Sequence, residues 1–398
     1  EKEYSFFLEN FDIGDFIEVA GVLFLTKKGE KTLKVSGAKM LAKSLLPLPE
    51  KWHGLQDIEE RFRKRYLDTL MNSEVKDRFI LRSKIIGEIR NFLIEADYLE
   101  VETPILQALP GGALARPFKT RHNALDLDLY LRVAPELFLK RLLVGGFEKV
   151  FEIGRNFRNE GIDRTHNPEF TMLEAYAAYE DYEGLMIFIE KMFSRLVKKI
   201  FGGESIEYKG QKIVFTAPWP RLDFSEMLSK HAEIDYDKES REGLAEKAEK
   251  LGLKVEKSDT KGKIADEIYK KICRQNLIQP VFLINHPLEI SPLAKKNENN
   301  PQKVQRFQVI AGGIELVNGF SELNDPIDQK ERMLEQEKFR EAGEAEVQRF
   351  DEDFIEALEH GMPPAAGFGI GVDRLAMLLT DTDNVKEVIL FPTLKPKS

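Results

Sequence analysis

Apolar residues recur at regular intervals along the chain and predict its main elements. From Ser73 onward they follow helical spacing, which predicts a long helix with a stripe at Val75, Phe79, Ile86, Ile89 and Leu93. Residues 98–103 form a β-rich run that Pro104 ends, so a strand should follow the helix. A second helix is predicted over 182–201.

Residues 147–179 form the most informative stretch and predict a two-stranded hairpin. Apolar positions alternate around Val150 in the first arm, and a polar loop with Gly161 and Asn167-Pro168 supplies the turn. Side chains alternate between the two sides of a strand, so one face of the second arm carries Phe170, Met172, Glu174 and Tyr176. A face that combines two aromatic side chains with a carboxylate indicates the wall of a pocket.

The N-terminal residues and the middle of the chain have different patterns. Residues 16–25 and 32–35 read as strands around a turn at 27–30, and residues 52–70 read as a charged helical linker. Residues 223–278 have helical spacing, with an interruption near 258–262.

Two further strands are predicted late in the chain. Residues 281–284 form one, and residues 306–322 form another with a bulge at Gly312-Gly313. A bulge is needed if Glu315 is to share a face with Asn318, because the two lie an odd number of residues apart.

The closely spaced glycines at 367–371 precede a helix that contains Arg374. Only about 25 residues follow, too few for the rest of a dinucleotide-binding βαβ unit, which excludes that interpretation.

Composition narrows the possible classes of protein. The 398 residues are 42% hydrophobic and 32% charged, enough for two or three domains. The single cysteine, Cys273, excludes a disulfide framework and favours a reducing cytoplasm, and no apolar run is long enough for a membrane span. The net charge of −9 argues against general nucleic-acid binding.

Arg158 and Glu174 are the first candidates for chemistry. An arginine presents a planar fork that suits a phosphate or a carboxylate, and a glutamate accepts hydrogen bonds from an amine. A surface ion pair between Arg158 and Glu160, with Phe170 in the core, is the simpler explanation, and spacing alone favours it.

The exact sequence of this stretch gives a more specific indication. FRNEG, followed by a loop and HNPEFTMLE, resembles the second signature motif of class II aminoacyl-tRNA synthetases in its lysyl form. The resemblance extends from about Gly14 to the C-terminus. It implies an α+β fold, with a catalytic antiparallel sheet flanked by helices.

The resemblance also implies a domain organisation. Residues 1–50 should form part of an OB-fold that binds the anticodon, residues 51–72 a linker, and residues 73–398 the catalytic domain with a helical insertion at about 223–278. Only about three of the five OB strands are present, which indicates either a fragment of a longer chain or a damaged anticodon module, and we favour the fragment. The helix from Ser73 and the strand after it resemble the first class II motif, which implies a homodimer. A helix that is simply part of the core would have the same sequence pattern.

The activity implied is the ATP-dependent ligation of L-lysine to tRNA(Lys), with Mg²⁺. Arg158 and Arg374 match the catalytic arginines. Residues matched to lysine binding are Gly112, Glu136, Arg158, Glu174, Tyr176, Asn318, Phe320 and Glu322. Residues matched to ATP binding are Arg158, Glu160, His166, Phe170, Glu315 and Arg374.

The expected metal ligands are Glu315, Glu322 and Gln308, and the last departs from the family, which usually has a glutamate there. Two alternatives remain open: a related enzyme that attaches a lysine-type residue to elongation factor P, and an inactive paralogue that binds tRNA or a protein. The partial OB-fold disfavours the first. The intact arginines and glutamates disfavour the inactive paralogue. Gln308 is the one feature that favours it.

Overall fold

The computed structural model describes residues 2–49, 55–341 and 348–397. The chain divides into two compact units, Glu1–Lys76 and Asp77–Ser398. The division falls inside the long helix α4 (Ser73–Glu95), slightly later than the predicted start of the catalytic domain.

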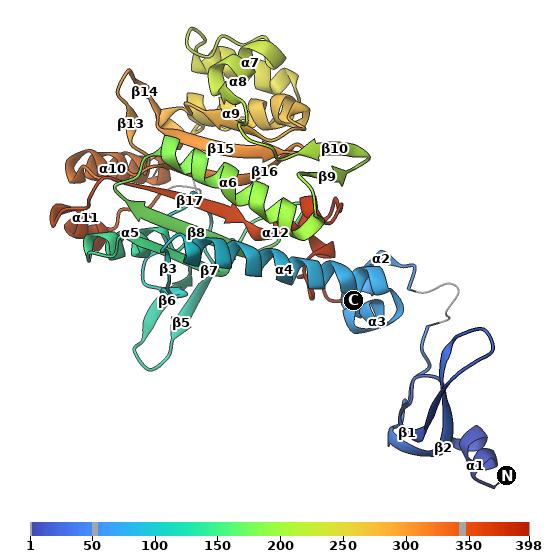
Figure 1. Cartoon of the computed structure of the whole chain (residues 1–398). Helices are drawn as coiled ribbons and strands as arrows, with labels where there is room; N and C mark the ends of the chain where they lie inside the picture. The colour runs from blue at the N-terminus through green and yellow to red at the C-terminus, as the bar shows by residue number, and fades with distance from the viewer. Residues whose placement is uncertain (1, 50–54, 342–347, 398) are drawn as a thin grey trace. The chain divides into compact units, whose positions relative to one another are not determined.

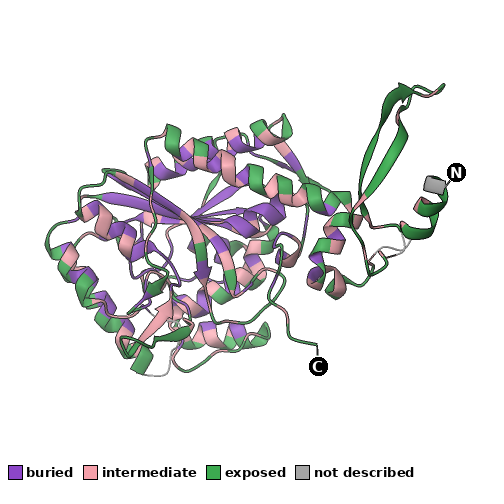
Figure 2. Ribbon diagram, turned by 90° about the horizontal axis from the view of Figure 1, so that it is seen from below, coloured by how far each residue is buried: buried purple, intermediate pink, exposed green. Residues whose placement is uncertain are grey.

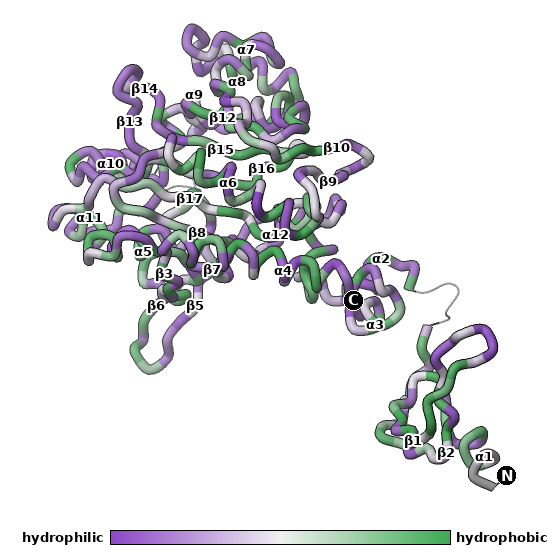
Figure 3. The backbone as a smooth tube through the Cα atoms, in the orientation of Figure 1, coloured by the Kyte–Doolittle hydropathy of each residue, from purple (hydrophilic) through white to green (hydrophobic). Residues whose placement is uncertain are grey.

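The first unit has little core. It contains α1 (Lys2–Asn10), an antiparallel hairpin of β1 (Phe16–Leu25) and β2 (Lys31–Ala42), and the short helices α2 (Ile58–Arg63) and α3 (Arg65–Met71). The described residues show two strands here where about three were predicted. Every residue of β1 is exposed (Figure 2), although much of the hairpin is apolar (Figure 3). The predicted linker helix began at Trp52, which lies outside the described residues.

An eight-stranded sheet organises the second unit (Figure 1). Six central strands are antiparallel and one parallel strand lies at each edge. The order across the sheet is β11 (Arg221–Asp223), β12 (Val281–Ile284), β15 (Arg306–Ala311), β16 (Ile314–Ser321), β17 (Ala365–Gly371), β8 (Glu169–Ala178), β7 (Lys149–Phe157) and β3 (Leu99–Glu100). The antiparallel sheet flanked by helices is confirmed. The predicted strand at 98–103 is only two residues long.

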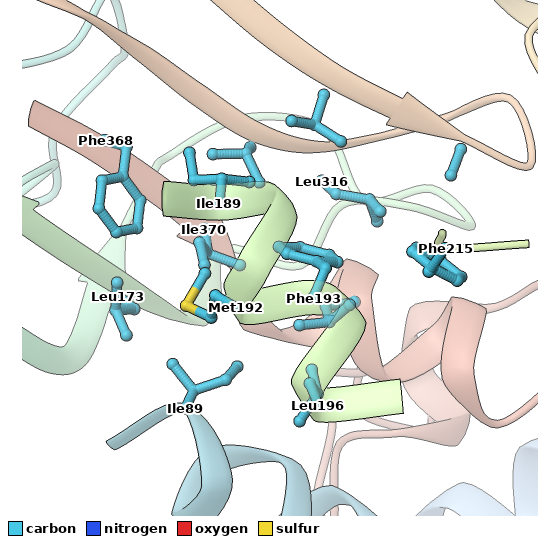
Figure 4. Close-up of a cluster of buried hydrophobic side chains, with 14 of the residues drawn as sticks. Ile89, Leu173, Ile189, Met192, Phe193, Leu196, Phe215, Leu316, Phe368 and Ile370 are labelled. Carbon is cyan, nitrogen blue, oxygen red and sulfur yellow. The ribbon is translucent and has the colours of Figure 1, made fainter. Parts of the chain in front are cut away.

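One face of the sheet is closed by the two longest helices. Helix α6 (Tyr182–Phe201) and helix α4 pack against every second side chain of the strands. The buried apolar side chains between the helices and the sheet stabilise this packing. Figure 4 shows Met192 and Phe193 of α6 among side chains from the sheet and from α4, including Leu173, Ile370 and Ile89. The Asp181 side chain caps α6 by accepting from Gly184 N–H at 2.8 Å.

The opposite face is covered only at its two sides. On one side lie the helices of the predicted insertion, α7 (Phe224–Ala232), α8 (Arg241–Lys250) and α9 (Lys261–Ile268), with their own apolar cluster. On the other side lie α5 (Glu136–Val144), α10 (Pro326–Glu341) and α11 (Glu352–Glu359) around a second cluster. The middle of this face is left for a pocket.

The stretch 306–322 differs from its prediction. Gly312-Gly313 is a two-residue turn, with φ of 59° and 72°, that joins β15 and β16 into a hairpin. The irregularity lies further on, because Val309 pairs with Val317 while Ile310 pairs with Glu315, so Leu316 is the extra residue. The need for a bulge was correct and its position was wrong.

The remaining elements are short. Strands β4 (Leu106–Gln107), β6 (Leu127–Leu131) and β5 (Lys119–His122) form a small sheet, and β9 (Ser205–Tyr208) with β10 (Gln211–Val214) and β13 (Lys296–Asn297) with β14 (Asn300–Val304) form hairpins. Short helical turns are η1 (Tyr269–Cys273), η2 (Arg274–Asn276), η3 (Leu288–Ile290) and η4 (Val385–Glu387), and α12 (Val372–Leu379) follows β17. Among the described helices, none combines the length and apolar composition needed to cross a membrane.

Candidate active site

A pocket of about 390 Å³ occupies the open middle of the sheet. Its walls contain Gly112, Glu136, Arg158, Glu160, His166, Phe170, Glu174, Tyr176, Gln308, Glu315, Asn318, Phe320 and Arg374, which are all of the predicted site residues except Glu322. Segments from residue 112 to residue 374 therefore meet in one cavity. The predicted aromatic and acidic face of the second arm is confirmed, since Phe170, Met172, Glu174 and Tyr176 all line it.

Arg158 stands at one end of the pocket, directly after β7. Its backbone N–H donates to Pro168 O at 2.8 Å, which holds the hairpin loop, and its guanidinium lies 5.0 Å from the centre of the Phe170 ring. Its Nε is buried and has no hydrogen-bond partner in the described part of the chain. Burial lowers the pKa of Arg158, and the nearby charge of Arg374 acts in the same direction. A partly buried cation with an unused donor is suited to an anion.

Arg374 reaches the same end from the first turn of α12. Its guanidinium donates to His166 Nε2 at 2.8 Å, and His166 Nδ1 lies 2.8 Å from an Asp163 oxygen. This arrangement needs the neutral imidazole, with the proton on Nδ1. His166 therefore connects the hairpin loop to the arginine of the last helix.

The opposite end of the pocket is acidic and completely buried. Glu136 begins α5, and Glu322 follows β16; the exposed fractions of these residues are 6% and 1%. The ammonium of Lys140 lies between them, 2.7 Å from Glu136 Oε1 and 2.5 Å from Glu322 Oε2. The two glutamates do converge on one ammonium, but that ammonium belongs to the chain. A substrate without a cation would therefore still leave both glutamates paired with Lys140.

Glu174 lies between the two ends, on β8. Tyr176 OH donates to Glu174 Oε2 at 3.0 Å. Burial raises the pKa of Glu174 to about 8, and the charge of Glu136 adds to the effect. Burial also raises the pKa of Glu322 to about 8, against the opposing charge of Lys140, and raises that of Glu136. A cation entering this region would favour the ionised carboxylates.

Gly112 shapes the acidic end through close contact. Its φ is +87°, and a Cβ atom there would lie 2.8 Å from Glu136 Cβ, so a larger residue would displace the glutamate. Its N–H donates to Gln348 Oε1 at 3.0 Å. Asn318 is fixed in a similar way, because its Oδ1 accepts from Arg306 Nε at 2.7 Å.

The metal prediction is only partly supported by this geometry. Glu315 lines the pocket, and one carboxylate together with substrate phosphates is a usual Mg²⁺ site. Gln308 lines it too, but its Oε1 lies 3.2 Å from Nε2 of the buried His286. Burial lowers the pKa of His286 to about 3, so the imidazole is neutral and its Nε2–H donates to that oxygen.

Glu322 cannot join this set, which corrects its predicted metal role. It lies seven residues after Glu315 along an extended strand, roughly 20 Å away, whereas Mg²⁺ ligands lie at about 2 Å. Its carboxylate is committed to Lys140 instead. In the described ranges, no group of three or more histidine, cysteine, aspartate or glutamate side chains could hold a metal ion.

Some residues in or beside this pocket escaped the sequence analysis: Arg306, Gln348, Asp266 and Lys270 line it, and Lys140 pairs with Glu136 at its acidic end. Lys140 follows Glu136 by four residues, and that spacing was the one available signal. Asp266 and Lys270 belong to the helical insertion, in which no site was expected. They pair at 2.8 Å at the edge of the cavity.

The fold and the pocket together define a class of protein. Its features are an antiparallel sheet and a single cavity that contains Arg158, from the hairpin β7–β8, and Arg374, from the last helix. The family model described as tRNA synthetases class II (D, K and N) matches residues 57–395. The chain belongs to this family.

Comparison with individual proteins is more specific than the family model. The lysine–tRNA ligase of Syntrophomonas wolfei is 52% identical over 97% of this chain and 79% of its own length. That of Pelotomaculum thermopropionicum is 53% identical over 97% of this chain and 77% of its own. That of Thermoanaerobacter pseudethanolicus is 52% identical, over the whole of this chain and 80% of the relative.

Proposed function

We propose that this chain is a lysine–tRNA ligase, which activates L-lysine with ATP to lysyl-adenylate and transfers the lysyl group to the 3′ end of tRNA(Lys). Relatives about 50% identical over nearly the whole chain carry this name. The observation that carries the proposal is a single cavity with two arginines at one end and a buried acidic group at the other.

Activation brings two anions together, and the positive charges of the two arginines would reduce the repulsion between them. A carboxylate oxygen of lysine attacks the α-phosphorus of ATP, the bond to the β-phosphate oxygen breaks, and pyrophosphate leaves. Arg158 would bridge the lysine carboxylate and the α-phosphate, and Arg374 would hold the γ-phosphate, so that both reduce the repulsion. No nucleophilic side chain is required.

The other pocket residues orient the two substrates. Phe170 would stack on adenine, with His166 near the phosphates and Glu160 near the nucleotide. Glu136 and Glu322 would select the ε-ammonium, and Gly112, Glu174, Tyr176, Asn318 and Phe320 would enclose the rest of the amino acid. Glu315 would hold Mg²⁺ together with phosphate oxygens, and the ion would offset phosphate charge.

Two further expectations belong to this proposal. We infer a homodimer, because the segment from α4 to β4 exposes a series of apolar side chains: Ile80, Ile94, Leu99, Ile105, Leu106 and Leu109. We also infer a cytoplasmic location, where tRNA is charged for translation.

The test is lysine-dependent exchange between ATP and pyrophosphate. Glu322→Gln should raise the KM for lysine about 100-fold, because a buried charged hydrogen-bonding group is lost, and should leave the KM for ATP within about threefold. Glu331→Gln, an exposed glutamate on α10, is the matched control and should behave like the wild type. Equal effects on both KM values would contradict the role of Glu322, and no exchange by the wild type would contradict the function.

A further inference from the structure

Lys140 is an unusual residue to find buried beside the acidic end of the pocket. It lies on α5 one turn after Glu136, and its side chain has no exposed surface. Its ammonium contacts both Glu136 and Glu322 and lies 5.3 Å from the ring centre of Phe320 and 6.0 Å from that of Phe354. A buried ammonium is strongly unfavourable unless it is paired, so this one is tied to the two carboxylates.

The position of Lys140 excludes a direct role toward the substrate. Glu136 and Phe320 line the pocket, whereas Lys140 and Glu322 do not. The ammonium, like the carboxylate of Glu322, thus lies outside the lining of the cavity, while Glu136 contacts both the cavity and the ammonium. Two ionised glutamates and one lysine leave one negative charge uncompensated, which is the charge that a single side-chain ammonium would neutralise.

We propose that Lys140 is a positioning residue that sets the charge of the amino-acid end of the pocket. It contacts both Glu136 and Glu322 and opposes their protonation, and once both are ionised it leaves them with a net charge matched to one substrate ammonium. This inference rests on the proposed function, because it takes lysine as the amino acid that enters.

The reason lies in the competition between a proton and the substrate cation. Two buried carboxylates this close to one point cannot both stay ionised without a cation, and in its absence they share a proton. Burial raises the pKa of Glu136 and Glu322, and the charge of Lys140 opposes that rise. The charges of both glutamates in turn outweigh burial and raise the pKa of Lys140, so it stays protonated.

The other titratable and charged groups around Lys140 do not replace it. They are Glu174 and Tyr176 on β8, Arg306 on β15, Arg132 before α5, and the Arg141–Asp351 pair between α5 and α11. Arg132 is held by Glu152, Arg306 by Asn318, and Arg141 by Asp351. Among these groups, only Lys140 is ion-paired with both Glu136 and Glu322.

The experiment is Lys140→Met, assayed by lysine-dependent ATP–pyrophosphate exchange from pH 6.5 to 9.5. At pH 7 the KM for lysine should rise at least about tenfold while the KM for ATP stays within about twofold. The acid limb of the kcat/KM profile for lysine should move up by at least about one pH unit, because the pKa of the glutamate pair rises by that amount. An unmoved acid limb, or a parallel rise in both KM values, would overturn the proposal.

Chemical rescue separates lost charge from lost packing. In Lys140→Ala, propylammonium should restore exchange at least about fivefold, whereas propanol, which has a similar size and no charge, should not. Equal rescue by both compounds, or loss of folding in both variants that propylammonium does not reverse, would assign Lys140 a purely structural role. Lys149→Met is the control, because Lys149 donates to Ala96 O at 3.1 Å outside the pocket, and it should keep the wild-type profile. Failure of the wild type itself would instead contradict the proposed function.

Discussion

The two ends of the pocket solve the problem of buried charge in different ways. The arginine end is only partly buried, and its guanidinium groups stay charged at any relevant pH. The glutamate end is fully buried, and burial raises the pKa of its carboxyl groups toward neutrality. One end therefore has a fixed charge, while the charge of the other depends on what binds there.

The difference follows from where each end lies in the fold. Arg158 and Arg374 stand at the end of a strand and at the start of a helix, where the chain leaves the sheet. Glu136 and Glu322 lie next to the apolar cluster formed by α5 and α11, which excludes water. Acidic groups in such a place need a cation, and Lys140 supplies it in part.

The largest effect is expected at the arginine end, whose charge does not depend on pH. Arg158→Met should lower kcat for ATP–pyrophosphate exchange by about 10³-fold or more, because a preorganised cation at the reacting phosphate is lost. The decrease should be similar at pH 6.5 and 8.5, as expected for a group that does not titrate. Exchange rates at saturating lysine and ATP, at both pH values, check this.

Arg164→Met provides the comparison for Arg158. It removes an exposed arginine of the same hairpin loop, one that contacts Asp383, and it should change kcat less than about twofold. A loss in Arg158→Met that disappeared at high pH would contradict the view that this end has a fixed charge.

The variable end predicts a smaller, pH-dependent effect. Glu174 and Glu322, whose pKa values are raised to about 8, are largely protonated at pH 7 in the free enzyme. A raised carboxyl pKa favours the protonated form, so kcat/KM for lysine should rise at least about tenfold for each pH unit well below 8 and level off above it. ATP binding at the arginine end should not show this limb. A flat lysine profile from pH 6.5 to 8.5 would contradict it.

The smallest effect is expected at Gln308, between the two ends. Gln308→Glu adds a carboxylate near Glu315 and should lower the Mg²⁺ concentration for half-maximal exchange by up to about tenfold. The neutral His286 can still donate to the new carboxylate, so folding should be kept. A titration of exchange activity with Mg²⁺ at fixed ATP checks this, and an unchanged midpoint would mean that residue 308 does not face the ion.

Several features could be predicted from the sequence because they depend on local pattern. Helix α6 was predicted at 182–201 and strand β12 at 281–284, and both agree with the structure. The alternation in β8 correctly placed Phe170 and Glu174 on the pocket face. The length of β3 and the position of the bulge in β16 could not be predicted, because both depend on which strand lies alongside.

The sequence by itself determined the family, the order of the elements and the residue types available to the pocket, because signature motifs and periodicity are written along the chain. Only the tertiary structure decided which charges meet. It paired Glu136 and Glu322 with Lys140 and turned Gln308 toward His286. The physical reason is that burial and distance set the energy of a charge, and both arise only when distant segments pack together.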